Sequence, residues 1–266
     1  MRTLNRSIPE DWFVCPISKK PLMRRGPQLC SAQDCFSQDL EFGFWNFTPS
    51  KLEELRTPEW KTWEQLQSNG LVSYERDPEH NLGVGMRPDF LQFAEFCRFR
   101  GSILDIGVGP QRVPTHIEYS EDTTVFFVGI DPLRGGQPRE FAFVQGLGEY
   151  LPFRPSLFDQ ILFVTSLDHF IDPYRPLEEA RRVLKPDGEL CIWIGEKDKN
   201  APKPGASNNW YDELSVPDGA EDRFHFRRFG RSDLERWLDE LKLTSRQHAV
   251  LVIDSWRRNV FYRARF

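Results

Sequence analysis

Apolar residues after position 101 fall into short continuous runs, which are typical of strands buried on both faces of a parallel sheet. Turn residues and helical segments separate these runs. The strands predicted from the pattern span 103–106, 125–130, 141–144, 159–165, 189–194, 248–253 and 259–265. The sequence therefore predicts an α/β fold with a Rossmann-like, mostly parallel seven-stranded sheet flanked by helices.

Helical spacing predicts helices on either side of this region. Thr57 and Pro58 are typical of a helix start, and large apolar residues then recur every three or four positions. A second helix is predicted after Pro88. A later helix is predicted to open with a capping box formed by Ser232 and Glu235.

Three regions differ in pattern. Residues 1–50 hold three of the five cysteines among short aromatic runs, which predicts a small β-rich, ribbon-like head. Residues 51–100 are predicted to be a helical connection that covers the active site. Residues 101–266 are predicted to be the main domain, with a functional loop at 196–230 that is rich in Pro, Asn, Gly and Asp.

Composition and charge restrict the partners and the cellular location that we expect for this chain. The formal net charge of −5 makes a nucleic acid an unlikely partner, since phosphate binding needs a concentrated positive field. The longest apolar runs are strand-sized, so no membrane span is predicted. The first seven residues contain no apolar signal segment, and five cysteines are an odd number for a disulfide framework. Both features favour a reducing, cytoplasmic location.

The segment 103–110 has the strongest chemical signal. A buried strand delivers Asp105 to its end, and Gly107 and Gly109 allow a tight turn against a ligand. The next strand ends in Asp131, 26 residues beyond Asp105, where an acidic residue can accept hydrogen bonds from ribose hydroxyls. Taken alone, this pattern also fits any nucleotide-binding turn or a structural glycine turn.

Five ordered segments of the chain resemble class I S-adenosylmethionine-dependent methyltransferases, in particular the branch that includes the ubiquinone/menaquinone biosynthesis enzymes. These segments are 103–110, 129–131, 148–153, 157–173 and 177–188. The resemblance implies S-adenosylmethionine as cofactor. Asp105 would hold its methionine amino group, Asp131 its ribose and the 148–149 turn its adenine edge. The candidate cofactor residues are Asp105, Gly107, Gly109, Asp131, Gly148, Glu149, Ser166 and Arg87, the last of which lies outside the resemblance.

The loop after the fourth strand of the resemblance holds the catalytic candidates. In this family that loop projects beside the sulfonium, so His169, with Asp168, is the candidate base for an acceptor hydroxyl. The alternative is that these two residues only order their own loop. His116 and His225 are weaker candidates. Arg87 either clasps a carboxylate of cofactor or substrate as a bidentate fork or is a plain surface arginine.

The 196–230 loop is the expected acceptor lid. Its candidate substrate residues are Asn208, Asn209, Trp210, Tyr211 and His225, because aromatic faces beside hydrogen-bonding groups suit sugars or polar rings. The leading hypothesis is methyl transfer to a small-molecule or carbohydrate-like acceptor at oxygen. The alternatives are an RNA base as acceptor and a non-catalytic cofactor-binding subunit. A homodimer is possible.

Several positions depart from the family pattern. Gln111 replaces the third glycine of the first motif, and Leu147 stands where an acidic adenine contact is usual. Only nine residues separate Asp131 from Phe141, too few for a crossover helix, so this helix is predicted to be lost.

The head resembles a degenerate form of the zinc ribbons found on some methyltransferases, including ribosomal-RNA guanine-N1 methyltransferases. Ser18 stands where the second thiolate of a Cys-x-x-Cys knuckle is expected. Cys15, Cys30 and Cys35, with Asp34 or water, are therefore only weak zinc ligands. A metal-free ribbon with buried cysteines is the alternative, and zinc is the less favoured of the two.

Overall fold

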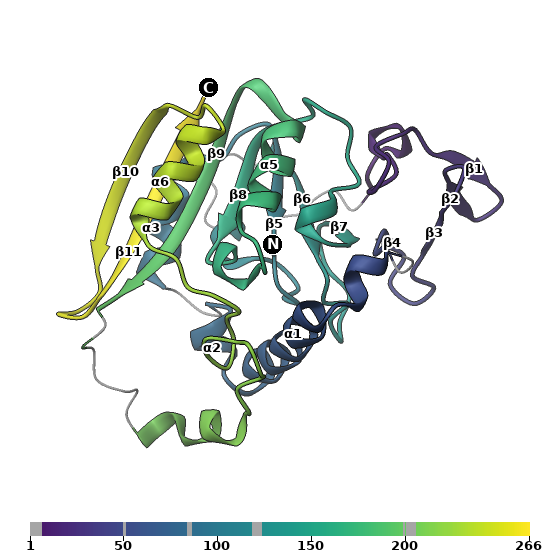
Figure 1. Cartoon of the computed structure of the whole chain (residues 1–266). Coiled ribbons are helices and arrows are strands. Elements are labelled where there is room, and N and C mark those ends of the chain that lie inside the picture. The colour runs from purple at the N-terminus through teal and green to yellow at the C-terminus, as the bar shows by residue number, and fades with distance from the viewer. Residues whose placement is uncertain (1–6, 50–51, 84–86, 119–123, 199, 201–205) are drawn as a thin grey trace.

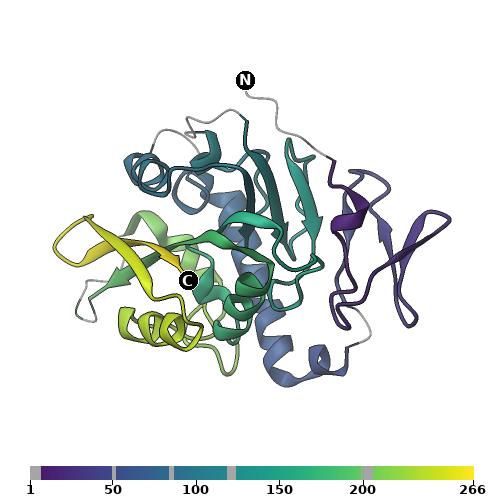
Figure 2. The ribbon, with the colours of Figure 1, turned by 90° about the horizontal axis from the view of Figure 1, so that it is seen from above.

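The structure is a computed structural model, and it describes residues 7–49, 52–83, 87–118, 124–198, 200 and 206–266. Its strands form one twisted sheet with helices on both faces (Figures 1 and 2). The predicted α/β, Rossmann-like class is therefore confirmed.

The predicted strand count is wrong, because the sheet has eleven strands in the order β1-β2-β3-β4-β7-β6-β5-β8-β9-β11-β10. The seven from β7 to β10 correspond to the seven predicted strands. They are β5 (Ser102–Ile106), β6 (Phe126–Asp131), β7 (Ala142–Gln145), β8 (Phe158–Val164), β9 (Leu184–Lys197), β10 (Ser245–Val252) and β11 (Arg257–Arg265).

The head accounts for the four additional strands: β1 (Met23–Arg25), β2 (Gln28–Cys30), β3 (Cys35–Gln38) and β4 (Trp45–Asn46). Strand β4 pairs in parallel with β7, where Trp45 lies opposite Val144 and Asn46 opposite Gln145. This pairing continues the sheet into the head, because it satisfies backbone groups that the edge strand β7 would otherwise expose.

Two apolar layers cover the sheet. Helices α5 (Tyr174–Val183) and α6 (Arg231–Glu240) bury their apolar faces against one side, together with head residues such as Phe13 and Phe47. Helix α3 (Pro88–Cys97) and the short α4 (Thr115–Glu118) pack on the other side (Figure 2).

Helix α1 (Pro58–Arg76) and the short α2 (Pro78–Asn81) lie across the edge where the parallel strands end (Figure 1). Thr57 occupies the residue before α1, as predicted. The predicted capping box of α6 is wrong. This helix begins at Arg231, so Ser232 lies inside its first turn, and it is the Asp233 carboxylate that accepts a hydrogen bond from the Gly230 amide at 3.1 Å.

The predicted loss of a crossover helix is confirmed, since an irregular loop joins β6 to β7. The buried guanidinium of Arg139 holds this loop. It donates to the carbonyl oxygens of Gly109 and, at 2.8 Å, Leu133, and it lies 3.6 Å from the Phe143 ring centre. The head adds an ion pair of 2.7 Å from Asp39 to Arg134, so it covers the place of the missing helix.

Cys30 and Cys35 form a disulfide between β2 and β3, where the strand register puts them opposite each other. This bond occupies two of the three sulfur atoms named as weak zinc ligands, so that ligand set is wrong. Cys15 is a buried free thiol. The disulfide also removes the argument for a reducing compartment that was based on the cysteine count. Among the described residues, no helix has the length and apolar character needed to cross a membrane.

Candidate functional site

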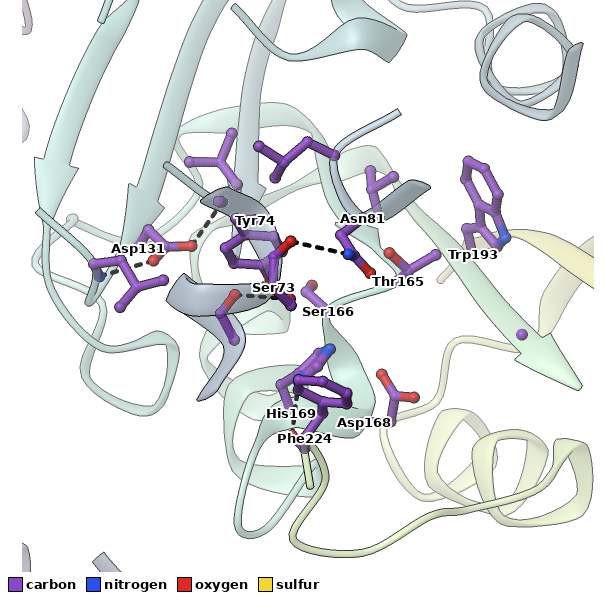
Figure 3. A pocket seen from close by; sticks show the side chains of 18 of the residues that line it. Ser73, Tyr74, Asn81, Asp131, Thr165, Ser166, Asp168, His169, Trp193 and Phe224 are labelled. Carbon is purple, nitrogen blue, oxygen red and sulfur yellow. Dashed lines mark hydrogen bonds between the residues drawn. The ribbon is translucent and has the colours of Figure 1, made fainter. Parts of the chain in front are cut away.

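A cavity of about 340 Å³ lies where β5, β6 and β8 end, beneath helix α1 (Figure 3). In an open α/β sheet, ligands bind at this edge, outside the carboxyl ends of the strands. The lining includes Asp105, Gly107, Gly109, Asp131 and Ser166, so five of the residues predicted to hold a cofactor are brought together here.

The glycine turn is shaped by close packing. Gly107 has φ +79°, and a Cβ atom there would lie 2.5 Å from Cβ of Ser166. Ser166 in turn donates its hydroxyl to the Ile106 carbonyl oxygen at 2.6 Å. A side chain at position 107 would therefore push apart the two loops that form the cavity floor.

Asp131 is anchored by the backbone. Its carboxylate accepts hydrogen bonds from the amides of Gly109 at 2.7 Å and Leu133 at 2.8 Å. Burial raises the pKa of Asp131, although the charge of Arg139 and these two hydrogen bonds act in the opposite direction. Each carboxylate oxygen retains a lone pair for a ligand, because each accepts one of these bonds.

Four buried polar atoms in the cavity wall have no hydrogen-bond partner among the described residues. They are Asp105 Oδ1, Gln111 Oε1, His116 Nδ1 and Trp193 Nε1. The other oxygen of Asp105 lies 2.9 Å from His116 Nε2, so His116 supports Asp105 from behind. An unpartnered buried polar atom is costly, and a polar ligand in the cavity would supply the missing partners.

Other predicted cofactor residues are placed differently. Arg87 reaches the lining, but its guanidinium is paired with the Asp89 carboxylate and donates to the His80 carbonyl oxygen at 2.7 Å. Gly148 and Glu149, both described, lie outside the lining. Glu149 is buried without a hydrogen-bond partner for its carboxylate, and burial raises its pKa to about 7.

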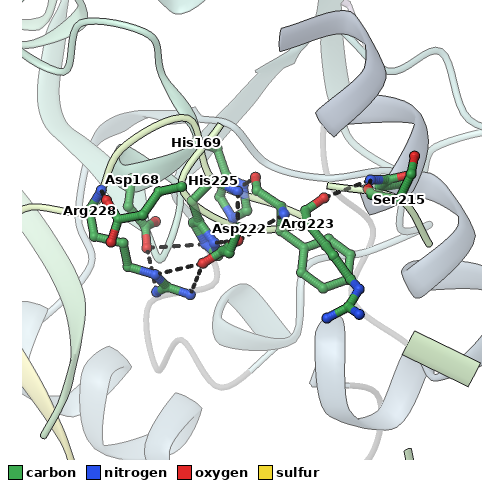
Figure 4. Close-up of polar contacts among 10 residues, drawn as sticks. Asp168, His169, Ser215, Asp222, Arg223, His225 and Arg228 are labelled. Atoms are coloured by element: carbon green, nitrogen blue, oxygen red, sulfur yellow. Dashed lines mark hydrogen bonds and ion pairs between the residues drawn. The ribbon is translucent and has the colours of Figure 1, made fainter. Parts of the chain in front are cut away.

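Asp168, His169 and His225 meet at one wall of the cavity (Figure 4). His169 Nδ1 lies 3.1 Å from the Phe224 carbonyl oxygen, and the His169 ring centre lies 4.5 Å from that of His225. Burial lowers the pKa of His169 to about 4, and the neighbouring His225 contributes to this lowering. His169 is therefore neutral at pH 7.

Two carboxylates flank His225. Its Nδ1 lies 2.7 Å from Asp222 Oδ1 and its Nε2 lies 3.3 Å from Asp168 Oδ2. The Arg228 guanidinium contacts both acids, at 3.5 Å from Asp168 and 3.0 Å from Asp222. The pKa of Asp222 is lowered, because hydrogen bonding and charge from His225 outweigh the effect of burial.

The 196–230 loop contributes Phe224, His225 and Arg228 to the lining. Trp210 and Tyr211, both described, do not line the cavity. Instead, their rings stack on each other, and the Tyr211 hydroxyl accepts a hydrogen bond from Asn81 at 3.3 Å. The side chains of Asn208 and Asn209 lie outside the described residues.

Residues 51–100 were predicted to cover the site, but the sequence did not reveal which side chains of helix α1 face the cavity. Trp63 and Tyr74 line the cavity from this helix, as Trp193 does from β9. Trp63 also donates its indole N–H to the His169 carbonyl oxygen at 2.9 Å. The helical spacing of large apolar residues predicted this helix, but such spacing does not distinguish a core residue from one that faces a ligand.

Comparisons with known proteins agree with this architecture. Residues 104–192 match the family model described as a methyltransferase domain. An uncharacterized protein of Methanocaldococcus jannaschii is 35% identical over 101 residues, which is 37% of this chain and 47% of that protein. The ubiquinone/menaquinone biosynthesis C-methyltransferase UbiE of Wigglesworthia glossinidia brevipalpis is 24% identical over 137 residues, 46% of this chain and 55% of that enzyme. The chain thus spans about half the length of these curated relatives.

Two solved structures show the same fold. A Burkholderia thailandensis 1,6-didemethyltoxoflavin-N1-methyltransferase with bound 1,6-didemethyltoxoflavin and S-adenosylhomocysteine has a TM-score of 0.55 at 16% identity, covering 89% of this chain and 97% of that chain. A Haemonchus contortus phosphoethanolamine N-methyltransferase 2, with phosphomonomethylethanolamine and S-adenosylhomocysteine, has a TM-score of 0.54 at 12% identity, covering 78% of this chain and 60% of that chain. The resemblance to class I methyltransferases found in the sequence is confirmed; the zinc-ribbon resemblance of the head is not.

Proposed function

We propose that this chain, which has the class I S-adenosylmethionine-dependent methyltransferase fold and carries a methyltransferase domain at residues 104–192, binds S-adenosylmethionine and transfers its methyl group to a small acceptor. The observation that carries this proposal is the cavity at the strand ends, where a glycine turn lies between two buried carboxylates. The unpartnered buried atoms in its wall fit a ligand that is polar along most of its length.

The donor set suits this cofactor. The free oxygen of Asp105 is a candidate acceptor for the cationic methionine amino group, and Trp193 Nε1 is a free donor for a carboxylate. Asp131 keeps lone pairs for ribose hydroxyls, while Gly107 and Gly109 let the backbone approach closely. Ser166 holds the floor of the turn. When bound, the cofactor supplies a methyl group on a sulfonium cation.

The wall formed by Asp168, His169 and His225 is proposed to receive the acceptor. Methyl transfer needs little from the protein beyond aligning the acceptor and excluding water. Because the carbonyl oxygen of Phe224 can only accept, His169 Nδ1 carries the proton of that hydrogen bond, which leaves Nε2 of the neutral ring as a lone pair. A lone pair beside a carboxylate suits an acceptor that must give up a hydroxyl proton, so oxygen is the proposed methylated atom.

The size and enclosure of the cavity support a small acceptor. A volume of about 340 Å³ lies within the range of small-molecule sites. Trp63 and Phe224 give its acceptor end flat apolar faces, which suit a polar ring or a carbohydrate-like molecule.

Titration calorimetry with S-adenosylhomocysteine tests the proposal directly. We expect one site per chain, and at least about tenfold weaker binding by Asp131→Ala, since a lost hydrogen-bonding carboxylate costs on the order of 1.4 kcal/mol or more. Asp187→Ala, an exposed residue near the start of β9, is the matched control and keeps wild-type affinity. Absence of binding of both S-adenosylmethionine and S-adenosylhomocysteine by the wild type contradicts the proposed function.

A further inference from the structure

We propose that Asp168, His169 and His225 bind one divalent transition-metal cation at the acceptor end of the cavity. Each residue offers one ligand atom, and the three ligand atoms lie within 4.8 Å of one another. Asp168 Oδ2 and His225 Nε2 are 3.3 Å apart. Two imidazoles and one carboxylate, with open positions facing a cavity, are a recurrent ligand set for such ions.

The orientation of both histidines supports the proposal. Metal-ligating histidines usually donate the N–H of their other ring nitrogen to a carboxylate or a backbone carbonyl. Here His225 Nδ1 faces the Asp222 carboxylate at 2.7 Å, and His169 Nδ1 faces the Phe224 carbonyl oxygen at 3.1 Å. Both partners accept, so in the neutral rings the Nδ1 atoms carry the hydrogens and both Nε2 atoms present lone pairs.

The Nε2 lone pair of His225 faces another hydrogen-bond acceptor, the carboxylate of Asp168. His225 Nε2 and Asp168 Oδ2 are both electron-rich at 3.3 Å, and the Arg228 guanidinium lies beside this oxygen at 3.5 Å. A proton or a cation between the two atoms would remove the repulsion between them. A proton on His225 is one solution, and a metal cation shared with His169 is the other. The proximity of the two histidine rings, with centres 4.5 Å apart and planes tilted by 32°, favours the cation, because it brings the second imidazole within reach of the same point.

Arg228 competes with the proposed metal cation for the carboxylate of Asp168. Its guanidinium lies 3.5 Å from the Asp168 carboxylate and 3.0 Å from that of Asp222, where it neutralises part of their charge. A cation at the proposed site must share Asp168 with it. Removal of the guanidinium therefore tightens metal binding, whereas a purely structural role for the cluster predicts no such gain.

The two imidazole ligands determine which divalent cations the proposed site would prefer. Imidazole nitrogens suit Zn²⁺, Cu²⁺, Ni²⁺ and Fe²⁺, whereas Mg²⁺, Ca²⁺ and Mn²⁺ prefer oxygen ligands. The functional part of the inference rests on the proposed function: the oxygen of the acceptor would occupy an open coordination position. This arrangement would orient the oxygen and lower the pKa of its hydroxyl. His169 then serves as a ligand, so the sequence-based role of a free base does not apply to the metal-bound protein.

Calorimetric titration of the chelator-treated full chain with ZnCl₂, repeated with CoCl₂ and its visible absorption, tests the site without any activity measurement. We expect one Zn²⁺ per chain for the wild type and for His248→Gln, an exposed histidine on β10. His225→Gln and Asp168→Asn should bind at least about tenfold more weakly, as for a lost ligand. Arg228→Gln should bind more tightly than the wild type.

The outcomes separate the two proposals. A wild type that binds S-adenosylhomocysteine but neither Zn²⁺ nor Co²⁺ overturns the metal site and leaves the proposed function standing. Equal Zn²⁺ binding by all variants assigns the ion to other residues, such as Cys15, and also overturns it. A gain in affinity for Arg228→Gln cannot arise from misfolding, so it supports the site even where a ligand variant fails to fold.

Discussion

Glu189 on strand β9 offers a quantitative test of the structure. Its carboxylate belongs to a residue that is 1% exposed, and it meets the guanidinium groups of Arg100 at 2.6 Å, Arg263 at 2.6 Å and Arg265 at 2.7 Å. The group therefore joins the segment after α3 to strands β9 and β11. We expect Glu189→Gln to destabilise the fold, because the variant keeps the size of the side chain and loses its charge.

The magnitude follows from the pKa. Burial acts to raise the pKa of Glu189, but hydrogen bonds and charge from the three arginines outweigh it and lower the pKa to about 2, from 4.5. A difference of about 2.5 pH units corresponds to roughly 3 kcal/mol. This is an upper figure, since the Arg100 and Arg265 side chains are 42% and 47% exposed and solvent screens them.

The sign of the pH dependence is fixed by the direction of the shift. A carboxyl group whose pKa is depressed in the folded state contributes its full stability above the unfolded pKa of 4.5, and this contribution falls as the pH drops towards 2. Urea denaturation followed by circular dichroism should thus show Glu189→Gln up to about 3 kcal/mol less stable than the wild type at pH 7. The gap should narrow to about 1 kcal/mol at pH 3.

Glu95→Gln is the matched control, because Glu95 is exposed on α3, and its stability should equal that of the wild type at both pH values. The same destabilisation of Glu189→Gln at pH 7 and pH 3 would refute the electrostatic reasoning. So would a difference below about 0.5 kcal/mol at pH 7, which is the effect of an ordinary surface substitution.

Two further predictions concern the site. Gly107→Ala should abolish S-adenosylhomocysteine binding in calorimetry, because its Cβ would clash with Ser166. The control Gly136→Ala, whose added Cβ would meet nothing within 4 Å, should bind as the wild type does. Retained affinity in Gly107→Ala would contradict the proposed cofactor site at the glycine turn. Asn69→Ala should speed hydrogen exchange across 215–223, because it removes two hydrogen bonds to that segment, each worth about 1 kcal/mol. Unchanged exchange would mean that Asn69 does not hold this segment in place.

The central sheet could be predicted because its strands contain short apolar runs, such as the ILFV of β8 and the LCIWI of β9, and such runs are distinctive in a chain of average composition. The head could not be predicted to the same extent. Its strands are two to four residues long, and the pairing of Trp45 with Val144 joins segments that are far apart in sequence. The disulfide between Cys30 and Cys35 depends on the register within the head, which such short strands do not reveal.

Some residues of the site could likewise be predicted from the sequence and others could not. Asp105, Gly107 and Asp131 were identifiable because strand ends and glycine turns leave local signals. The association of His169 with His225 depends on the path of a loop more than fifty residues away, and no local pattern encodes it. Trp210 and Tyr211 were expected at the acceptor because they are aromatic, yet they pack on each other and on α2. Composition cannot distinguish these two uses of an aromatic ring.

The attachment of the 215–223 segment by Asn69 has a consequence for the engineering of this part of the chain. Its amide donates to the main-chain carbonyl oxygens of Ser215 and Arg223, at 3.0 and 2.8 Å. Every amino acid supplies a main-chain oxygen, so substitutions between residues 215 and 223 need not weaken these two hydrogen bonds. The stretch between residues 215 and 223 is therefore a suitable place to insert loops of other sequences, because Asn69 of helix α1 holds it through main-chain atoms alone.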